Sequence, residues 1–241
     1  MHALVPVKDQ VLAKGRLSGV LAPNERRLLN QAMLEDVLSV VSGHRHIEKT
    51  VLVSDDPVAA LLADKYAAES FSVRDADARD LNGSLSAACK QLAERGVDDV
   101  LIVPGDLPML QGTDLDALIE QSLSVRVDVV LGPDSKNDGT NAMLFANSAF
   151  PALQYGPGSF ARHKAMAQRC GLDYAVVRRP GVARDVDTAS DLLAVVAAKT
   201  SAELGRHTAE FLSRREIAER LNLLRETGIG ATDDECGAVN E

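Results

Sequence analysis

Three aspartates stand where the chain could build a metal site. Asp106 follows Val100 to Val103, four apolar residues that predict a strand buried on both faces of a parallel sheet. Open α/β sheets bind their ligands at the carboxyl ends of such strands. An acid at that edge could bind a metal, hold a polyphosphate through the metal, or act as a base. It could equally cap a helix or a turn.

Asp185 and Asp187 favour the metal interpretation. Alternate side chains of an extended segment point to the same face, so these carboxylates would share one face across Val186. Together with Asp106 they would form an oxygen-ligand site for Mg2+, which usually keeps several waters and takes phosphate oxygens as further ligands. The alternative is that Asp187 only caps the helix that follows, and it could do both.

A basic loop follows the first expected strand. It carries Lys8, Lys14 and Arg16, which could hold the phosphates of a nucleotide, since phosphates bind at this place in a doubly wound sheet. A basic surface loop is the alternative. The loop does not match the Walker pattern G-x-x-x-x-G-K-[ST], and G-x-G-x-x-G does not follow the first strand, which argues against a Walker-type ATPase and a dinucleotide-binding dehydrogenase.

Two small-residue loops could bind an anion through backbone N–H groups and hydroxyls. One is 139–141, and the other is 156–160, where Ser159 also begins a helix whose N-terminus favours negative charge. Either loop could instead be a plain turn. His163, one turn into that helix, could face the site or be solvated.

The positions of these residues depend on alternating strands and helices. Apolar runs predict strands over 3–7, 50–53, 70–73, 100–103, 128–133, 141–145 and 175–177, and helical spacing predicts helices between most of them. This alternation predicts an α/β fold with a single mostly parallel doubly wound sheet. Beyond residue 198 a charged helix with an apolar stripe predicts a C-terminal extension that packs on the core or forms a homodimer contact.

Composition narrows the function. The 241 residues are 46% hydrophobic and carry a net charge of −9, which argues against nucleic-acid binding because phosphate backbones attract basic surfaces. Cys89, Cys170 and Cys236 are far apart, which predicts no disulfide framework. Neither a signal peptide nor a membrane span is visible, so we expect a cytoplasmic protein that does not bind membranes.

Taken in order, these motifs resemble the 2-phospho-L-lactate guanylyltransferase family, which includes phosphoenolpyruvate and 3-phospho-D-glycerate guanylyltransferases of coenzyme F-420 biosynthesis. The resemblance rests on 5–8, 13–17, 53–57, 81–82, 104–108, 139–142, 156–160 and 185–188. It implies a nucleotidyltransferase fold of the Rossmann-like, nucleotide-diphospho-sugar transferase type. The implied partners are GTP, a phosphorylated three-carbon acid and the downstream transferase that uses the deazaflavin acceptor.

The resemblance also implies roles for individual residues. It makes Asp106, Asp185 and Asp187 the ligands of Mg2+ and places the phosphorylated acid on Thr140, Gly156 and Ser159. Lys14 and Arg16 would act on the triphosphate as catalytic groups. Asn82, Gly83 and Ser84 would lie near the guanine or ribose, with Lys8 also on the nucleotide side. Gly15 departs from the serine expected there.

Two other functions stay open at this level. One is a molybdenum-cofactor or sugar-phosphate nucleotidyltransferase, although the glycine-rich opening loop of those enzymes is absent. The other is a regulatory protein that binds a nucleotide without catalysis. The resemblance implies a guanylyltransferase domain over 1–198, and we expect a C-terminal helix and a disordered tail over 199–241.

Overall fold

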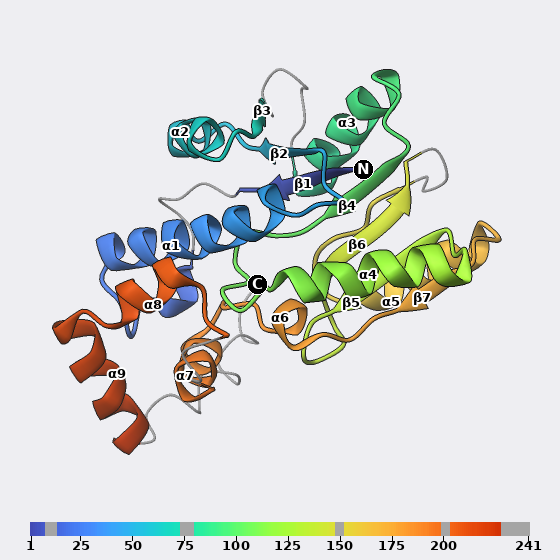
Figure 1. Ribbon diagram of the computed structural model, residues 1–241. Helices are drawn as coiled ribbons and strands as arrows, with labels where there is room; N and C mark the ends of the chain where they lie inside the picture. Colours follow the sequence, from blue (N-terminus) through green and yellow to red (C-terminus); the bar gives the residue numbers. More distant parts are fainter. Residues whose placement is uncertain (8–13, 73–79, 148–151, 199–202, 228–241) are drawn as a thin grey trace, which may run out of the picture.

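A seven-stranded sheet forms the centre of the protein, with strands in the order β3-β2-β1-β4-β6-β5-β7 (Figure 1). The computed structural model describes residues 1–7, 14–72, 80–147, 152–198 and 203–227. The strands are β1 (His2–Pro6), β2 (Lys49–Val53), β3 (Glu69–Phe71), β4 (Asp99–Ile102), β5 (Val129–Pro133), β6 (Thr140–Ala146) and β7 (Tyr174–Val176). They confirm the segments expected from the apolar runs, with ends shifted by one or two residues.

The sheet is parallel except at β6, which runs antiparallel to both β4 and β5. From β1 the chain passes outward to β2 and β3, and then returns to the other side of β1 at β4. Strand order therefore reverses between β1 and β4, the kind of point at which open α/β sheets bind ligands. Because β6 runs backwards, its first residue, Thr140, lies at the edge where the parallel strands end.

Helices cover both faces of the sheet. Before the C-terminal extension, the longer helices are α1 (Pro23–Ser42), α2 (Pro57–Lys65), α3 (Leu81–Glu94), α4 (Gly112–Val125), α5 (Ser159–Arg169) and α7 (Ala189–Ala197). Side chains of α1, α2 and α4 pack on one face, and those of α3 and α5 pack on the other. A 3-10 turn (Gly15–Leu17) and α6 (Pro180–Ala183) are too short for periodicity to reveal.

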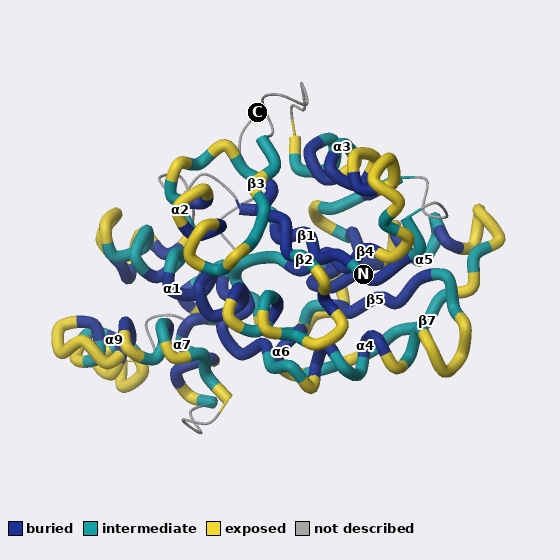
Figure 2. The backbone as a smooth tube through the Cα atoms, turned by 45° about the horizontal axis from the view of Figure 1, so that its top comes forward, coloured by how far each residue is buried: buried dark blue, intermediate teal, exposed yellow. Residues whose placement is uncertain are grey.

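Alternating strand residues feed the two faces of the core. Ala3 and Val5 of β1 pack in one cluster, whereas Leu4 packs in the other. β1, β2, β4, β5 and β6 are accordingly buried along most of their length, whereas the edge strands β3 and β7 are only partly buried (Figure 2). Every helix of the described residues is too short or too polar to cross a membrane.

The C-terminal extension consists of two helices, α8 (Arg206–Leu212) and α9 (Arg215–Thr227), where the sequence predicted one. Ile217 and Leu221 of α9 are buried in a third apolar cluster with residues of α1 and α7. This packing confirms that the apolar stripe covers the core; the homodimer stays a prediction.

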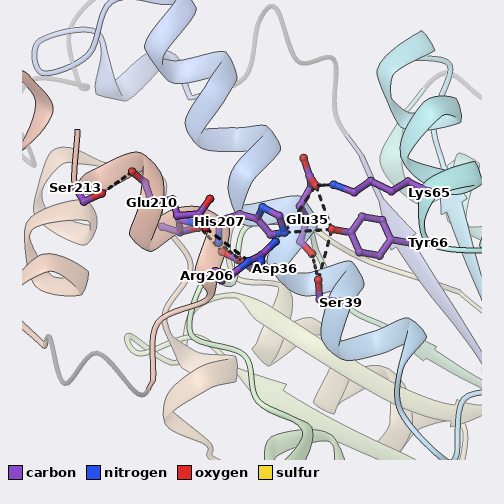
Figure 3. Close-up of polar contacts among 10 residues, drawn as sticks. Glu35, Asp36, Ser39, Lys65, Tyr66, Arg206, His207, Glu210 and Ser213 are labelled. Atoms are coloured by element: carbon purple, nitrogen blue, oxygen red, sulfur yellow. Dashed lines mark hydrogen bonds and ion pairs between the residues drawn. The ribbon is translucent and has the colours of Figure 1, made fainter. Parts of the chain in front are cut away.

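A carboxylate of α1 fastens the extension to the core (Figure 3). Asp36 accepts the backbone N–H groups of His207 and Thr208 at 2.8 and 2.9 Å. A side chain at Gly205 would collide with Asp36, since an added Cβ would lie 2.2 Å from its Cγ. Beside it, Glu35 accepts hydrogen bonds from Lys65 and Tyr66 of the α2 region. α1 therefore connects to α2 on one side and to α8 on the other.

Candidate active site

A pocket of about 270 Å³ opens at the reversal of strand order. Its walls come from the ends of β1 and β4, from the start of β6, and from the loops that follow β4 and precede α5 and α7. Asp106, Asp185 and Asp187 all line it, although they are far apart in the sequence. The pocket therefore brings the predicted acidic residues to the predicted edge of the sheet.

Lys14 lies between two of these carboxylates. Its Nζ donates to Asp106 Oδ2 and to Asp187 Oδ1, both at 2.7 Å, and only 5% of its side chain is exposed. Burial by itself would lower the pKa of Lys14, but attraction and hydrogen bonding by the two carboxylates outweigh that effect and raise it. The ammonium therefore stays charged at neutral pH.

Asp185 is held separately, by Asn141. The Asn141 amide donates to Asp185 Oδ1 at 3.0 Å and to the carbonyl of Val182 at 2.9 Å. Burial raises the pKa of Asp185, and the charges of Asp106 and Asp187 raise it further, against the opposing hydrogen bond from Asn141. A negative charge on Asp185 therefore calls for a nearby cation.

The acidic residues fit a divalent cation in chemistry but are not arranged around one. Carboxylate oxygens are ligands that Mg2+ accepts, and the ammonium of Lys14 already occupies a cation position between Asp106 and Asp187. Within the described part of the chain, however, no three acidic, histidine or cysteine side chains are grouped closely enough to hold a metal. The carboxylates are instead paired with Lys14 and hydrogen-bonded to Asn141.

The small-residue loops also form part of the pocket wall. Thr140, Gly156 and Ser159 line it, as expected for the loops that could bind an anion. Ser159 is the first residue of α5 and follows Gly158, whose left-handed φ of 70° favours glycine. Ser159 Oγ accepts the backbone N–H of Thr140 at 2.9 Å, which joins the two loops. The positive end of α5 is thereby directed toward the pocket.

The remaining predicted residues are not found in the described lining of the pocket. Lys8 is outside the described residues, and Arg16 is exposed and absent from the described lining of the pocket. Asn82, Gly83 and Ser84 are also absent from that lining; Leu81 and Leu85 of the same helix line it instead.

These three residues have structural partners. The Asn82 amide pairs with the backbone N–H and carbonyl of Tyr155, at 2.6 and 3.2 Å. Gly83 and Ser84 donate to Asp80, the residue that caps α3. Asn82 thus ties α3 to the loop before α5, and a place for the three residues near the guanine or ribose stays a prediction.

Two residues of the site carried no assigned role from the sequence. Asn141 positions Asp185, and its neighbour Thr140 was the only hint, since both belong to the same small-residue loop. His163 is fully buried behind the pocket and bonded to Thr140, where the sequence left open whether it faced the site or solvent. These hydrogen bonds join β6 to the loop before α7 and to α5, so only the folded chain shows them.

The chain is similar to known proteins over most of its length. A family model described as "Guanylyl transferase CofC like" matches residues 1–222, and so includes α8 and part of α9. A phosphoenolpyruvate guanylyltransferase of Conexibacter woesei is 36% identical over 190 residues, covering 79% of this chain and 84% of that protein.

Relatives named for other substrates are nearly as similar. A 2-phospho-L-lactate guanylyltransferase of Methanothermobacter thermautotrophicus is 32% identical, covering 88% of this chain and 89% of that protein. A 3-phospho-D-glycerate guanylyltransferase of Phenylobacterium zucineum is 31% identical, with coverage of 88% and 95%.

Among solved structures, a provisionally assigned nucleotide-diphospho-sugar transferase of Desulfovibrio desulfuricans G20 superimposes with a TM-score of 0.74 at 18% identity, covering 92% of this chain and 96% of that one. A cytidylyltransferase of Leptospira borgpetersenii superimposes with a TM-score of 0.56 at 11% identity, covering 95% of this chain and 94% of that one. These likenesses show a shared nucleotidyltransferase-type fold.

Proposed function

The chain belongs to the family of CofC-like guanylyl transferases, and we propose that it joins the GMP unit of GTP to a small phosphorylated three-carbon acid and releases pyrophosphate. The observation that carries the proposal is the pocket, in which a buried charged lysine and three carboxylates face a loop suited to an anion. The product would serve coenzyme F-420 assembly, as the family's role implies.

The reaction needs charge neutralisation more than proton transfer. A phosphate oxygen of the acid attacks the α-phosphorus of GTP, a new P–O bond forms, and the bond to pyrophosphate breaks. The attacking phosphate is already ionised at neutral pH, so no general base is required. Lys14 supplies a buried positive charge next to the site, where low dielectric makes it effective.

A divalent cation completes the proposed site. Asp106, Asp185 and Asp187 would hold it, and Mg2+ suits such an all-oxygen set. When bound, such an ion neutralises phosphate charge and aligns the reacting groups. Since Lys14 now bridges Asp106 and Asp187, its ammonium would have to leave at least one carboxylate and would then be free to contact phosphate.

The two substrates would occupy opposite ends of the pocket. The acceptor would lie against Thr140, Gly156 and Ser159, where the start of α5 offers hydroxyls and a positive helix end. The nucleoside would lie along the apolar side formed by Leu81 and Leu85. The carboxylates and Lys14 lie at the end of β4, within the same pocket, where the phosphates would meet.

A competition assay tests the function. The protein is mixed with GTP, Mg2+ and equal amounts of phosphoenolpyruvate, 2-phospho-L-lactate and 3-phospho-D-glycerate, and products are identified by mass. Adding the downstream transferase and its deazaflavin acceptor shows which product is used further. We expect pyrophosphate release that requires both GTP and one of the acids.

The controls separate this proposal from its alternatives. ATP and CTP in place of GTP test the base, and reactions without an acid test simple hydrolysis. Binding of GTP without pyrophosphate release, with all three acids present, would favour the non-catalytic regulatory protein. Turnover only with a sugar phosphate or a molybdenum-cofactor precursor would favour the other nucleotidyltransferases.

A further inference from the structure

His163 is a buried polar residue directly behind the anion-binding loops. It lies in α5 one turn after Ser159, is fully buried, and does not contribute to the described lining of the pocket. Both of its ring nitrogens are hydrogen-bonded. Nδ1 lies 2.9 Å from Thr140 Oγ1, and Nε2 lies 2.9 Å from the backbone nitrogen of Gln154.

The partner of Nε2 determines where the ring carries its proton. A backbone N–H can only donate, so Nε2 must offer a lone pair to Gln154. Burial, and secondarily the charge of Arg162, lowers the pKa of His163 to about 4, so the ring is neutral at pH 7. A neutral imidazole has one proton, which must therefore be on Nδ1, where it is donated to Thr140 Oγ1.

Both pocket hydroxyls are then used as acceptors from within the protein. Thr140 Oγ1 accepts from His163, and Ser159 Oγ accepts the backbone N–H of Thr140 at 2.9 Å. Both residues are buried and line the pocket. Among the residues that the structure describes, neither hydroxyl hydrogen has a protein acceptor, so both are left to a ligand.

We propose that His163 is a positioning residue that, by donating to Thr140 Oγ1, turns the Thr140 hydroxyl hydrogen toward the pocket beside the Ser159 hydroxyl, and so makes this wall select an anionic oxygen of the acceptor. The inference rests on the proposed function and assigns to it a residue that does not touch substrate. A hydroxyl that already accepts one hydrogen bond within the protein offers its hydrogen to the pocket. This favours a carboxylate or phosphate oxygen, which accepts, over a group that must itself donate.

The test compares variants that separate the hydrogen bond from the bulk of the ring. The rings of His163 and Tyr155 pack edge to face, with their centroids 5.0 Å apart. His163→Phe keeps an aromatic ring at this place and removes both nitrogens. His163→Asn keeps a donor at the δ position. Thr140→Val removes the hydroxyl at similar size, and the double variant His163→Phe/Thr140→Val completes a cycle. His207→Phe is the matched control, since His207 is distant in sequence and is not in the pocket lining.

We expect His163→Phe to raise KM for the acid about 10-fold or more, with a much smaller change in KM for GTP. In the Thr140→Val background the same substitution should change KM for the acid less than about 2-fold, because the hydroxyl it acts through is gone. His163→Asn should recover part of the loss. Independent multiplicative effects of the two substitutions, or equal effects on both substrates, would overturn the proposal.

A measurement on the unmodified protein covers the case in which His163→Phe does not fold or no acid is turned over. Nitrogen-15 NMR of labelled histidine distinguishes a protonated Nδ1 from a protonated Nε2, and inorganic phosphate serves as the probe ligand. A proton on Nδ1, with the His163 resonances shifting as phosphate binds, upholds the inference. A proton on Nε2, or phosphate binding that leaves His163 unchanged, refutes it whether or not the chain is an active guanylyltransferase.

Discussion

Lys14 shows how one residue can have two functions at the same site. Its ammonium lies 2.7 Å from both Asp106 and Asp187, so it neutralises part of a charge that burial makes costly. A divalent cation would need the same carboxylate oxygens. In the proposed reaction Lys14 would therefore compete with the cation and also supply positive charge to the triphosphate.

Removing this ammonium should change metal binding and catalysis in opposite directions. In Lys14→Met the carboxylates of Asp106 and Asp187 lose the ammonium that bridges them, so we expect the protein alone to bind Mn2+ more tightly in a calorimetric titration. Turnover should fall on the order of 100-fold, because the reacting phosphates lose a preorganised cation. Arg16→Met is the control for metal affinity, since Arg16 is exposed and should leave it unchanged. Weaker Mn2+ binding by Lys14→Met would contradict the competition.

Asp106 should be indispensable for turnover but not for folding. Asp106→Asn keeps the size of the side chain and removes its charge, so we expect kcat/KM to fall on the order of 100-fold or more while the melting temperature stays close to that of the unmodified protein. Asp64→Asn on the exposed surface of α2 is the control. Near-normal rates for Asp106→Asn would remove Asp106 from the metal site.

At the scale of elements, the reversed strand β6 is what places Thr140 and Asn141 in the site. Its antiparallel direction puts its first residues at the edge where β1 and β4 end. The helix that follows, α5, returns Ser159 and His163 to the same place. A strand and a helix that are separate in the sequence thus form one hydrogen-bonded wall.

The buried histidine of that wall should make folding sensitive to acid. The pKa of His163 is lowered to about 4 in the folded protein, first by burial and then by Arg162. An unfolded histidine has a pKa near 6.5, so only the unfolded chain takes up the proton between these values. The free energy of unfolding should therefore fall by about 3 kcal/mol as pH decreases from about 6.5 to about 4.

Urea unfolding at pH 7.5 and 4.5 measures this effect. His163→Phe lacks the titrating group, so its stability should fall less over the same range, while carboxylate titrations are common to both proteins. Parallel losses in the two proteins would show that His163 does not carry the effect.

The cap that Asp36 provides for α8 should be worth a measurable part of the stability. Asp36→Ala leaves the N–H groups of His207 and Thr208 without their acceptor, and Thr208 is buried. We expect the free energy of unfolding in urea to fall by about 1–3 kcal/mol.

Asp36→Asn keeps one acceptor oxygen and should lose less. Glu210→Ala should lose almost nothing, because its contact with Arg206 is long and exposed. Guanylyl transfer should be unchanged in Asp36→Ala, since Asp36 is not part of the described pocket lining. Equal stability of the Asp36→Ala and Glu210→Ala variants would rule out the cap.

At the scale of the molecule, the C-terminal helices are part of the core rather than an appendage. Phe211, Leu212, Ile217 and Leu221 are buried against side chains of α1 and α7. A chain ending at residue 198 would expose this apolar surface, so we expect it to melt at a lower temperature or to aggregate in size-exclusion chromatography. A chain ending at Thr227 keeps both helices and is the control. Full stability of the 1–198 chain would show that the first 198 residues fold independently.

The sequence by itself determined the elements and the identity of the acidic residues. Apolar runs and helical spacing predict the strands correctly because burial on both faces leaves little freedom in residue type. Asp106 stands out because it follows a buried apolar run, and Asp185 and Asp187 stand out because their spacing puts both carboxylates on one face of an extended segment. The family resemblance follows from the order of such motifs. These signals are local, and a single segment is enough to carry each of them.

Only the tertiary structure decided what those residues contact. Several features of the site depend on segments that meet only after folding. They are the antiparallel direction of β6, the ion pairs of Lys14 with two carboxylates, the hydrogen bond from Asn141 to Asp185, and the pairing of Asn82 with Tyr155. The same holds for His163, whose proton is placed by a backbone N–H nine residues away and directed at a threonine on another element. Hydrogen bonds depend on distance and direction in space, so sequence periodicity does not encode which donor meets which acceptor.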